Sequence, residues 1–401
     1  MFAPPDGFLT LHPLADPVTA QLRRKVVLLA ARALLTDALP TDRGRRAAAL
    51  RLRQGLQELL TASAPATLRA LGRPDVLPAL LCLTAGTLPP DACWEIGAPN
   101  LLAALHREGA SPASALLWPG PVPRLSGSCW GVVAPERPLR GVALDRSGLS
   151  VEDADGRIVD LGGTPPAQGP SERALSRPAL HLALADSNPL SELEAHPDKV
   201  GNALDLGGRA DGEWVAALNE ALDLIAVSLP GWLAGLPDAV TRFVPVGAQR
   251  ERHLSASYRE APGIAYLSLH PDPLTMAEAI VHEAQHSRLN LLMWLDPVLV
   301  NGQTEWTTSP VRPDLRPLSG VLLAAHAFVP VAAMHRALAL QRHPASLTPT
   351  FTRRRTQVLE TNRESLRILE ARGRPTTHGR RVIDALQQLS RWAEADGGTT
   401  A

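Results

Sequence analysis

The sequence has little cysteine and almost no lysine. Its 401 residues include three cysteines, Cys82, Cys93 and Cys129, which are too few and too scattered for a disulfide framework or a zinc knuckle. We expect them to be small buried side chains in a reducing compartment. Lys25 and Lys199 are the only lysines, so nearly every cation is an arginine. A local group of arginines is therefore weak support for a binding site.

The chain also lacks an excess of either charge. Forty Lys and Arg residues balance 40 Asp and Glu residues, and the isoelectric point is about 7.2. Nucleic acid and anionic membranes both require a surplus of basic charge, so neither is expected as the main partner. Hydrophobic residues make up 45% and charged residues 20% of the chain, which favours a folded protein over a disordered one.

No long hydrophobic run is present. The longest, residues 26–35, is interrupted by Arg32 and falls far short of the roughly 20 residues that span a bilayer. The first residues show no basic segment followed by an apolar one, the pattern of a signal peptide. These absences predict a cytoplasmic protein without a membrane partner.

The length is enough for two or three domains of roughly 100–200 residues each. Residues 1–113 place Leu, Val and Ala at spacings of three and four, which predicts an N-terminal helical region. Residues 114–177 contain short apolar runs between Gly and Asp turns, as in a small β meander with a linker. Pro, Gly and Ser accumulate over residues 109–128 and suggest the boundary. Residues 178–401 read as helices with a few strands, so the predicted class is α+β, mostly helical.

The C-terminal region carries the motif with chemical meaning, His282-Glu283-Ala284-Gln285-His286, inside a predicted helix over residues 275–295. Imidazoles at positions i and i+4 lie on one face of a helix, so a single metal ion can bind both. A predicted strand over residues 263–270 precedes this helix, which is the setting that the HExxH pattern requires. We predict a metal site here; the alternative is a pair of solvated or buried histidines.

The third ligand decides the chemistry. Leu292 stands where a metzincin has histidine, which excludes that class. Glu305 is available at gluzincin-like spacing but lies in a turn-like segment, and Asp296 is expected to end the helix. His326 lies in an otherwise apolar helix and is the preferred ligand, the alternative being a buried core histidine. His335 is the weaker candidate and is expected to be solvated.

Four segments in order resemble the α-ketoglutarate-dependent HExxH-type peptide β-hydroxylases found in gene clusters for ribosomal peptide natural products. The resemblance covers about residues 178–340, and the N-terminal half shows no motif of the family. The matching segments are LADSNPLSELEAHPDKVGNALDLGG, SASYREAPGIAYLSL, VHEAQHSRLNLLMWLDPVL and SPVRPDLRPLSGVLLAAHAFVPVAAMHRAL.

The resemblance implies an Fe(II) enzyme that uses 2-oxoglutarate and O2 to hydroxylate the β-carbon of a residue in a ribosomally synthesised precursor peptide. Asp is a common target in such families. His282, His286 and His326 would hold the iron and leave positions open for a ketoacid and O2. This all-nitrogen set departs from the usual two histidines and one carboxylate. Imidazole also suits zinc, so the ligands alone do not select the metal.

The second carboxylate of 2-oxoglutarate requires a cation, ideally an arginine that binds it through two hydrogen bonds. Arg312 and Arg316 are the candidates, because Pro313 and Pro317 stiffen their loop and Asp314 can orient one guanidinium. The alternative is two surface arginines in an arginine-rich protein.

Ser255, Ser257 and Tyr258 lie on a predicted strand ahead of the metal helix. In zinc peptidases the comparable strand binds the substrate backbone by strand addition, so these residues are candidates for binding a peptide. Strand packing explains them equally well. The predicted C-terminal domain is therefore a zincin-like sheet with the HExxH helix.

Two other functions remain open. In a zinc-dependent peptidase, Glu283 would be the general base that deprotonates a metal-bound water. In the hydroxylase it has no obligatory proton to accept and would position water, a ligand or substrate. A metal-stabilised peptide-binding module without catalysis is the third reading. The N-terminal region is a candidate for binding the leader part of the precursor peptide.

Overall fold

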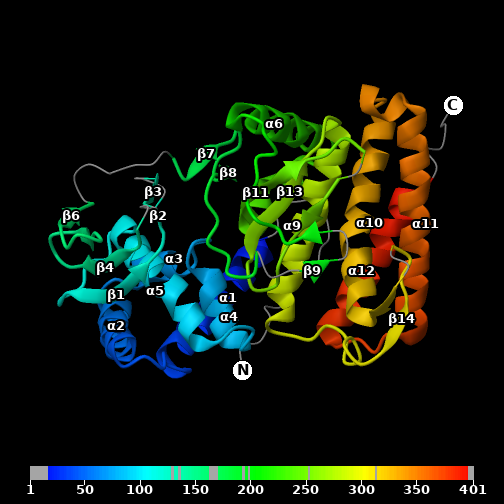
Figure 1. Ribbon diagram of the computed structural model, residues 1–401. Coiled ribbons are helices and arrows are strands. Elements are labelled where there is room, and N and C mark those ends of the chain that lie inside the picture. Colours follow the sequence, from blue (N-terminus) through cyan, green and yellow to red (C-terminus); the bar gives the residue numbers. More distant parts are fainter. Residues whose placement is uncertain are drawn as a thin grey trace.

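The computed structural model describes residues 17–127, 131–133, 137–161, 170–191, 195–196, 199–251, 253–311 and 314–395. Helices dominate and the strands form small sheets (Figure 1), in agreement with the predicted α+β class. The N-terminal helices and the β meander form one side of the molecule. The largest sheet lies between them and a group of long C-terminal helices (Figure 1).

The first region is helical because apolar residues recur every three or four positions. In α2 (Arg43–Ala62) this spacing buries Leu52, Leu56 and Leu59 on one face, while arginines lie on the other. Asp42 caps this helix, because its carboxylate accepts the backbone N–H of Arg45 and satisfies a donor of the first turn. The remaining helices here are α1 (Pro17–Thr36), α3 (Ala64–Leu71), α4 (Leu77–Ala85) and α5 (Pro90–Arg107).

The predicted β meander is an antiparallel sheet with strand order β1-β4-β5-β6. Its first strand lies where the sequence predicted a boundary. Trp118 on that strand is buried and stacks on Trp94 with ring centroids 5.9 Å apart, a contact that outweighs the local Pro and Gly content. The strands are β1 (Leu116–Val122), β4 (Leu139–Leu144), β5 (Leu149–Glu152) and β6 (Ile158–Asp160), beside a separate hairpin of β2 (Leu125–Gly127) and β3 (Gly131–Val133).

The larger sheet has the strand order β12-β13-β11-β8-β7. Its three inner strands are parallel, and both edge strands are antiparallel to their neighbours. Side chains alternate between the faces of β13: Ala265 and Leu267 join the core under the helices, and Ile264 and Tyr266 join a small cluster on the other face. The strands are β7 (Glu172–Ala174), β8 (His181–Ala183), β11 (Val240–Ala248), β12 (Ser255–Ala256) and β13 (Gly263–Leu269); β9 (Ala195–His196) pairs with β10 (Lys199–Val200).

The predicted metal helix is α9 (Pro273–Met293), which packs against β13 and between helices α6 and α10. It begins after Asp272, whose carboxylate accepts the backbone N–H groups of Leu274 and Thr275. The other C-terminal elements are α6 (Asp211–Ser228), α7 (Pro230–Ala234), α8 (Leu236–Ala239), β14 (Trp306–Thr308), β15 (Leu315–Pro317), α10 (Leu318–Leu340), η1 (Pro344–Leu347), α11 (Pro349–Arg372) and α12 (Thr377–Glu394).

The helix α10 is mostly apolar, with two buried histidines, and continues through Pro330. Among the described residues, it alone is long and apolar enough to cross a bilayer by length and composition, and 83% of its most apolar window is buried inside the structure. It packs against α9, α11 and α12 (Figure 1). A helix that is apolar on all sides is expected in the core of a folded protein.

One buried apolar cluster joins the two ends of the chain. It contains Leu22 of α1, Leu56 of α2, Leu292 of α9, Val321 of α10 and Val382 of α12. A second cluster fills the space between the larger sheet, α6 and α9. The domain boundaries near residues 113 and 177 stay a prediction, and the first cluster crosses both.

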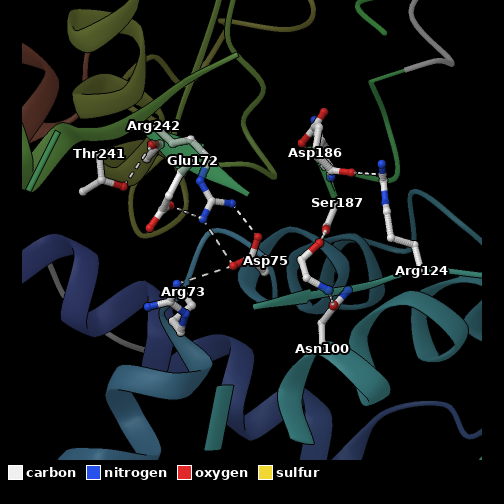
Figure 2. A network of polar contacts seen from close by, with 12 residues as sticks. Arg73, Asp75, Asn100, Arg124, Glu172, Asp186, Ser187, Thr241 and Arg242 are labelled. Carbon is white, nitrogen blue, oxygen red and sulfur yellow. Dashed lines mark hydrogen bonds and ion pairs between the residues drawn. The ribbon is translucent and has the colours of Figure 1, made fainter. Parts of the chain in front are cut away.

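Buried charges also join the N-terminal helices to the larger sheet (Figure 2). Arg242 on β11 and Asp75, in the turn before α4, are each 4% exposed. The Arg242 Nη2 atom lies 3.2 Å from Asp75 Oδ2 and 3.1 Å from Glu172 Oε2. Burial alone would raise the pKa of Asp75, but the charge and hydrogen bonds of Arg242 outweigh burial and lower it. The carboxylate is therefore ionised within this cluster.

A second set of contacts joins the β2 hairpin to the segment after β8 (Figure 2). Arg124 donates a hydrogen bond to the carbonyl oxygen of Asp186. The hydroxyl oxygens of Ser126 and Ser187 lie 3.1 Å apart, and Asn100 of α5 accepts the backbone N–H of Ser126. The small β region is thus attached both to α5 and to the strands that lead to α9.

Gly263 opens β13 with a φ of +96°, a conformation that residues with a side chain rarely adopt. A Cβ atom there would approach the half-buried guanidinium of Arg23 to 2.8 Å. We expect Gly263→Ala to lower the free energy of unfolding by about 1–3 kcal/mol, measured by urea denaturation. Gly212→Ala is the control, because its Cβ meets nothing within 4 Å. Equal stability of both variants would contradict the expected strain.

Candidate metal centre

The HExxH motif forms a compact group on α9. The ring centroids of His282 and His286 are 4.4 Å apart, as expected for side chains one helical turn apart. One ligand atom from each of His282, Glu283 and His286 lies within 4.8 Å of the other two. The structure therefore brings together the three motif residues that the sequence singled out.

The local sequence explains this placement. Apolar residues of α9, among them Ile280 and Ala284, are buried in the core beneath the sheet, which fixes the rotation of the helix. His282 and His286 are left half-buried, and Glu283 is 2% exposed. The Oε2 atom of Glu283 and the Nδ1 atom of His286 are buried without a hydrogen-bond partner among the described residues.

The imidazoles are held in the uncharged form. Burial lowers the pKa of His282 well below its usual value, and the charges of His286 and Arg354 act in the same direction. Burial also lowers the pKa of His286, while the charge of Glu283 opposes the shift. A neutral imidazole keeps a lone pair, which is the form that binds metal ions.

His326 on α10 is 3% exposed, and its Nδ1 atom has no hydrogen-bond partner among the described residues. Burial, followed by the charges of His286 and Arg288, lowers the pKa of His326 to about 3. His326 does not belong to the group within 4.8 Å. Its role as the third ligand stays a prediction.

His335 was expected to be solvated, and that expectation is wrong. It is 0% exposed, and its Nε2 atom lies 2.8 Å from Oε1 of the buried Glu278. Its ring packs against Phe351 of α11 with centroids 5.1 Å apart. The helix α11 covers this turn of α10, which the periodicity of α10 alone does not show. His335 therefore ties α10 to α9 one helical turn before His282.

The two carboxylates considered as third ligands are both bound by neighbours. Asp296 follows α9 and accepts hydrogen bonds from the Val298 N–H and the Thr376 hydroxyl, both at 2.7 Å, which fits its expected place at the helix end. Glu305 accepts hydrogen bonds from the Arg372 Nε at 2.9 Å and from Asn301. Neither carboxylate belongs to the group around His282.

The arginines predicted to bind 2-oxoglutarate receive little support from their positions. Arg312 lies outside the described residues. Arg316 lies on β15, with its Nε atom 2.8 Å from Asp314 Oδ2, the orientation that the sequence suggested. No contact between Arg316 and the motif histidines is found among the described residues.

The strand predicted to bind a peptide is β12, which forms one edge of the larger sheet. Ser255 on β12 pairs with Leu267 of β13. The Ser257 hydroxyl is buried without a partner among the described residues. Tyr258 accepts a hydrogen bond from Asn202 at 2.6 Å, and its ring packs on that of Tyr266. Packing therefore explains Tyr258, while Ser255 keeps the edge position that strand addition requires.

His253 is a residue that the sequence did not single out. It precedes β12 and interacts electrostatically with Glu283 and His282. Burial and the neighbouring His270 lower the pKa of His253 to about 4, and its Nε2 atom is buried without a partner among the described residues. The one signal that could have identified it is its place directly before the predicted edge strand.

A cleft of about 580 Å³ opens at the carboxyl ends of β11 and β13, where α/β proteins commonly bind ligands. Arg209, Glu213, Arg250, His270 and Met276 are among its lining residues. The motif residues of α9 do not line it, so this cleft is separate from the imidazole pair.

Comparison of the whole chain with known protein families and with curated proteins finds no match.

Proposed function

We propose that the protein is an Fe(II)- and 2-oxoglutarate-dependent dioxygenase that hydroxylates the β-carbon of a residue in a ribosomally synthesised precursor peptide. The observation that carries the metal site is the group of His282, Glu283 and His286 within 4.8 Å on one face of α9. The reaction class rests on the resemblance of four segments to the HExxH-type peptide hydroxylases. Asp is the candidate target residue.

The donor set fits a divalent transition metal. His282 and His286 are adjacent, and burial holds both in the neutral form, which is the form that binds metal ions. The third ligand would be His326, which like His286 has a buried Nδ1 atom without a hydrogen-bond partner in the part of the chain that the structure describes. When bound there, iron with 2-oxoglutarate would supply the activation of O2, while the protein binds and orients the peptide.

The peptide would lie along β12, the edge strand beside α9, and continue the sheet by strand addition. Ser255 lies on this strand, and Ser257 directly follows its end. We also propose that the sheet and α9 correspond to the zincin-like arrangement expected from the motif. Glu283, buried next to both histidines, would hold water or a substrate group beside them.

The alternative is a zinc-dependent peptidase in which Glu283 is the general base. Glu305, the carboxylate that a gluzincin would use as a ligand, is held by Arg372 and Asn301 and does not belong to the group around His282, which supports the hydroxylase over a gluzincin. A metal-stabilised binding module remains the third function.

The test is anaerobic reconstitution with Fe(II) and 2-oxoglutarate, followed by O2 and a candidate precursor peptide, sought as a short reading frame beside the gene. We expect a weak visible charge-transfer band and then a product heavier by one oxygen atom. Zinc-dependent cleavage that disappears in Glu283→Gln, without the band, would instead establish the peptidase. Peptide binding without either product, unchanged by metal removal, would leave the binding module.

A further inference from the structure

The segment that follows β12 ends in an arginine that is held in place. Arg259 lies three residues past Ala256, the last residue of β12, and its Nη2 atom donates to the backbone carbonyl of Met293 at 3.3 Å. The Arg259 Cζ atom lies 4.5 Å from the centroid of the Trp294 ring, a cation–π contact. The Trp294 indole N–H donates to the Arg259 carbonyl at 2.9 Å. These contacts fix Arg259 at the C-terminal end of α9.

The guanidinium of Arg259 keeps its capacity to bind an anion. Arg259 is exposed, and no carboxylate pairs with it in the part of the chain that the structure describes. Its neighbour Glu260 instead accepts a hydrogen bond from the Thr87 hydroxyl at 3.4 Å. Arg354, near the motif, is by contrast paired with Glu278. A carbonyl and an aromatic ring do not neutralise Arg259, and several of its five N–H groups stay available.

Arg259 is placed along the same face of α9 as the imidazole pair. Met293, which it contacts, lies seven positions after His286, so both residues lie on one face of the helix. Seven residues of an α-helix span about 10 Å. His253, before β12, interacts electrostatically with Glu283, and Arg259, after β12, contacts Met293. The segment that contains β12 therefore follows α9 from the motif to the end of the helix.

A peptide added to β12 would follow the same path, because β12 is an edge strand. Each residue of an extended peptide advances about 3.3 Å. The distance of about 10 Å along α9 from His286 to Met293 thus corresponds to about three peptide residues. When one residue of the peptide lies at the metal site, a residue three or four positions away would lie beside Arg259.

We propose that Arg259 selects peptides that carry an acidic residue three or four positions from the hydroxylated residue. The proposal rests on the function proposed above and names the class of its substrate, an acidic peptide segment. A carboxylate at this position would receive charge-assisted hydrogen bonds from the guanidinium. Met293 and Trp294 already orient the arginine, so binding would cost little side-chain freedom. The direction of the peptide along β12 decides whether the acid precedes or follows the hydroxylated residue.

The test measures peptide affinity of the full-length Fe(II) protein by fluorescence anisotropy under anaerobic conditions. The probes are short labelled peptides with a central Asp in a background of Thr and Val. They carry Glu, Gln or Lys at the third and fourth positions on one side of the Asp or on the other. We expect Glu on one side to give binding roughly 3–10-fold tighter than Gln, as a partly exposed ion pair with good geometry does, and Lys to give the weakest binding.

Two variants separate contact with the peptide from support of the loop. Arg259→Gln should bind the Glu and Gln peptides equally, and Arg259→Glu should reverse the order so that the Lys peptide binds best. A residue that only supports the loop would weaken all peptides alike and could not give this reversal. Arg353→Gln is the matched control, because Arg353 is exposed on α11 and contacts Thr350; it should keep the preference for Glu.

No preference for Glu in the unmodified protein, or the same preference in Arg259→Gln, would overturn the proposal. Equal weakening of every peptide in Arg259→Gln would also overturn it. The proposed function is measured separately by mass spectrometry after 2-oxoglutarate and O2 are added, which should add one oxygen atom to a bound peptide. A preference for Glu that depends on Arg259 without such a product would count against hydroxylation and uphold the selection of an acidic peptide.

Discussion

His286→Ala is expected to remove tight metal binding while leaving the fold intact. His286 supplies one of the two adjacent imidazoles, and its side chain is half-buried. Loss of a group that hydrogen-bonds to a ligand weakens metal binding about 10–100-fold. Loss of a ligand itself should weaken metal binding by a larger factor. The measurement is Fe(II) or Co(II) affinity by anaerobic titration, with far-UV circular dichroism as the check on folding.

The control for this prediction is His343→Ala, which changes a histidine at the start of η1, away from α9, and should bind metal normally. His326→Ala decides the third ligand. If it binds metal as weakly as His286→Ala, His326 is a ligand; if it binds normally, His326 is a core histidine and another group completes the site. Normal metal binding by His286→Ala would contradict the metal centre itself.

Asp75→Ala is expected to cause the largest loss of stability, about 3–5 kcal/mol, because it removes a partner from a buried ion pair. Arg242 is 4% exposed, so its charge would remain buried with Glu172 as the remaining acidic partner. The free energy of unfolding from urea titration is the measurement. The double variant Asp75→Ala with Arg242→Met should be more stable than Asp75→Ala alone.

The exposed pair of Arg137 and Asp155 provides the control, because both side chains are more than half exposed and such pairs contribute little to the free energy of unfolding.

The pH dependence of stability in acid gives a second measurement. The pKa of Asp75 is lowered in the folded state. Its contribution to the free energy of unfolding is therefore complete at pH values above the ordinary Asp pKa of about 3.9, and it is lost as the pH falls below that value. Asp75→Asn should lose less stability over this range. Equal stability of Asp75→Ala and Asp155→Ala would contradict the role of the buried pair.

The parts of the fold that depend on short stretches of sequence could be predicted. The metal helix and the strand before it follow from local periodicity and from one motif, and both appear as α9 and β13. The strand β1 was not predicted, because its Pro and Gly residues read as a boundary and its formation depends on Trp118 meeting Trp94 from a separate helix.

The candidate site could be predicted only where its residues lie within one helix. His282, Glu283 and His286 are positioned by the helical repeat. Arg354 reaches the site through Glu278, and His335 is buried by α11; both depend on which helices pack together, and the sequence pattern does not show that. His253 likewise depends on the register of β12 along β13. In an arginine-rich chain, spatial position distinguishes one arginine from another where composition cannot.

The buried pair of Asp75 and Arg242 has a consequence for how this protein can vary among its relatives. The two residues are 167 positions apart in the chain, yet each is the main neutralising partner of the other. A genetic exchange that replaced the N-terminal helices with those of a related chain would remove the main acidic partner of Arg242 and leave it with Glu172 alone, unless the new segment carried an acid at the same place. Positions 75 and 242 should therefore change together, and viable recombinants should join outside the interval between them.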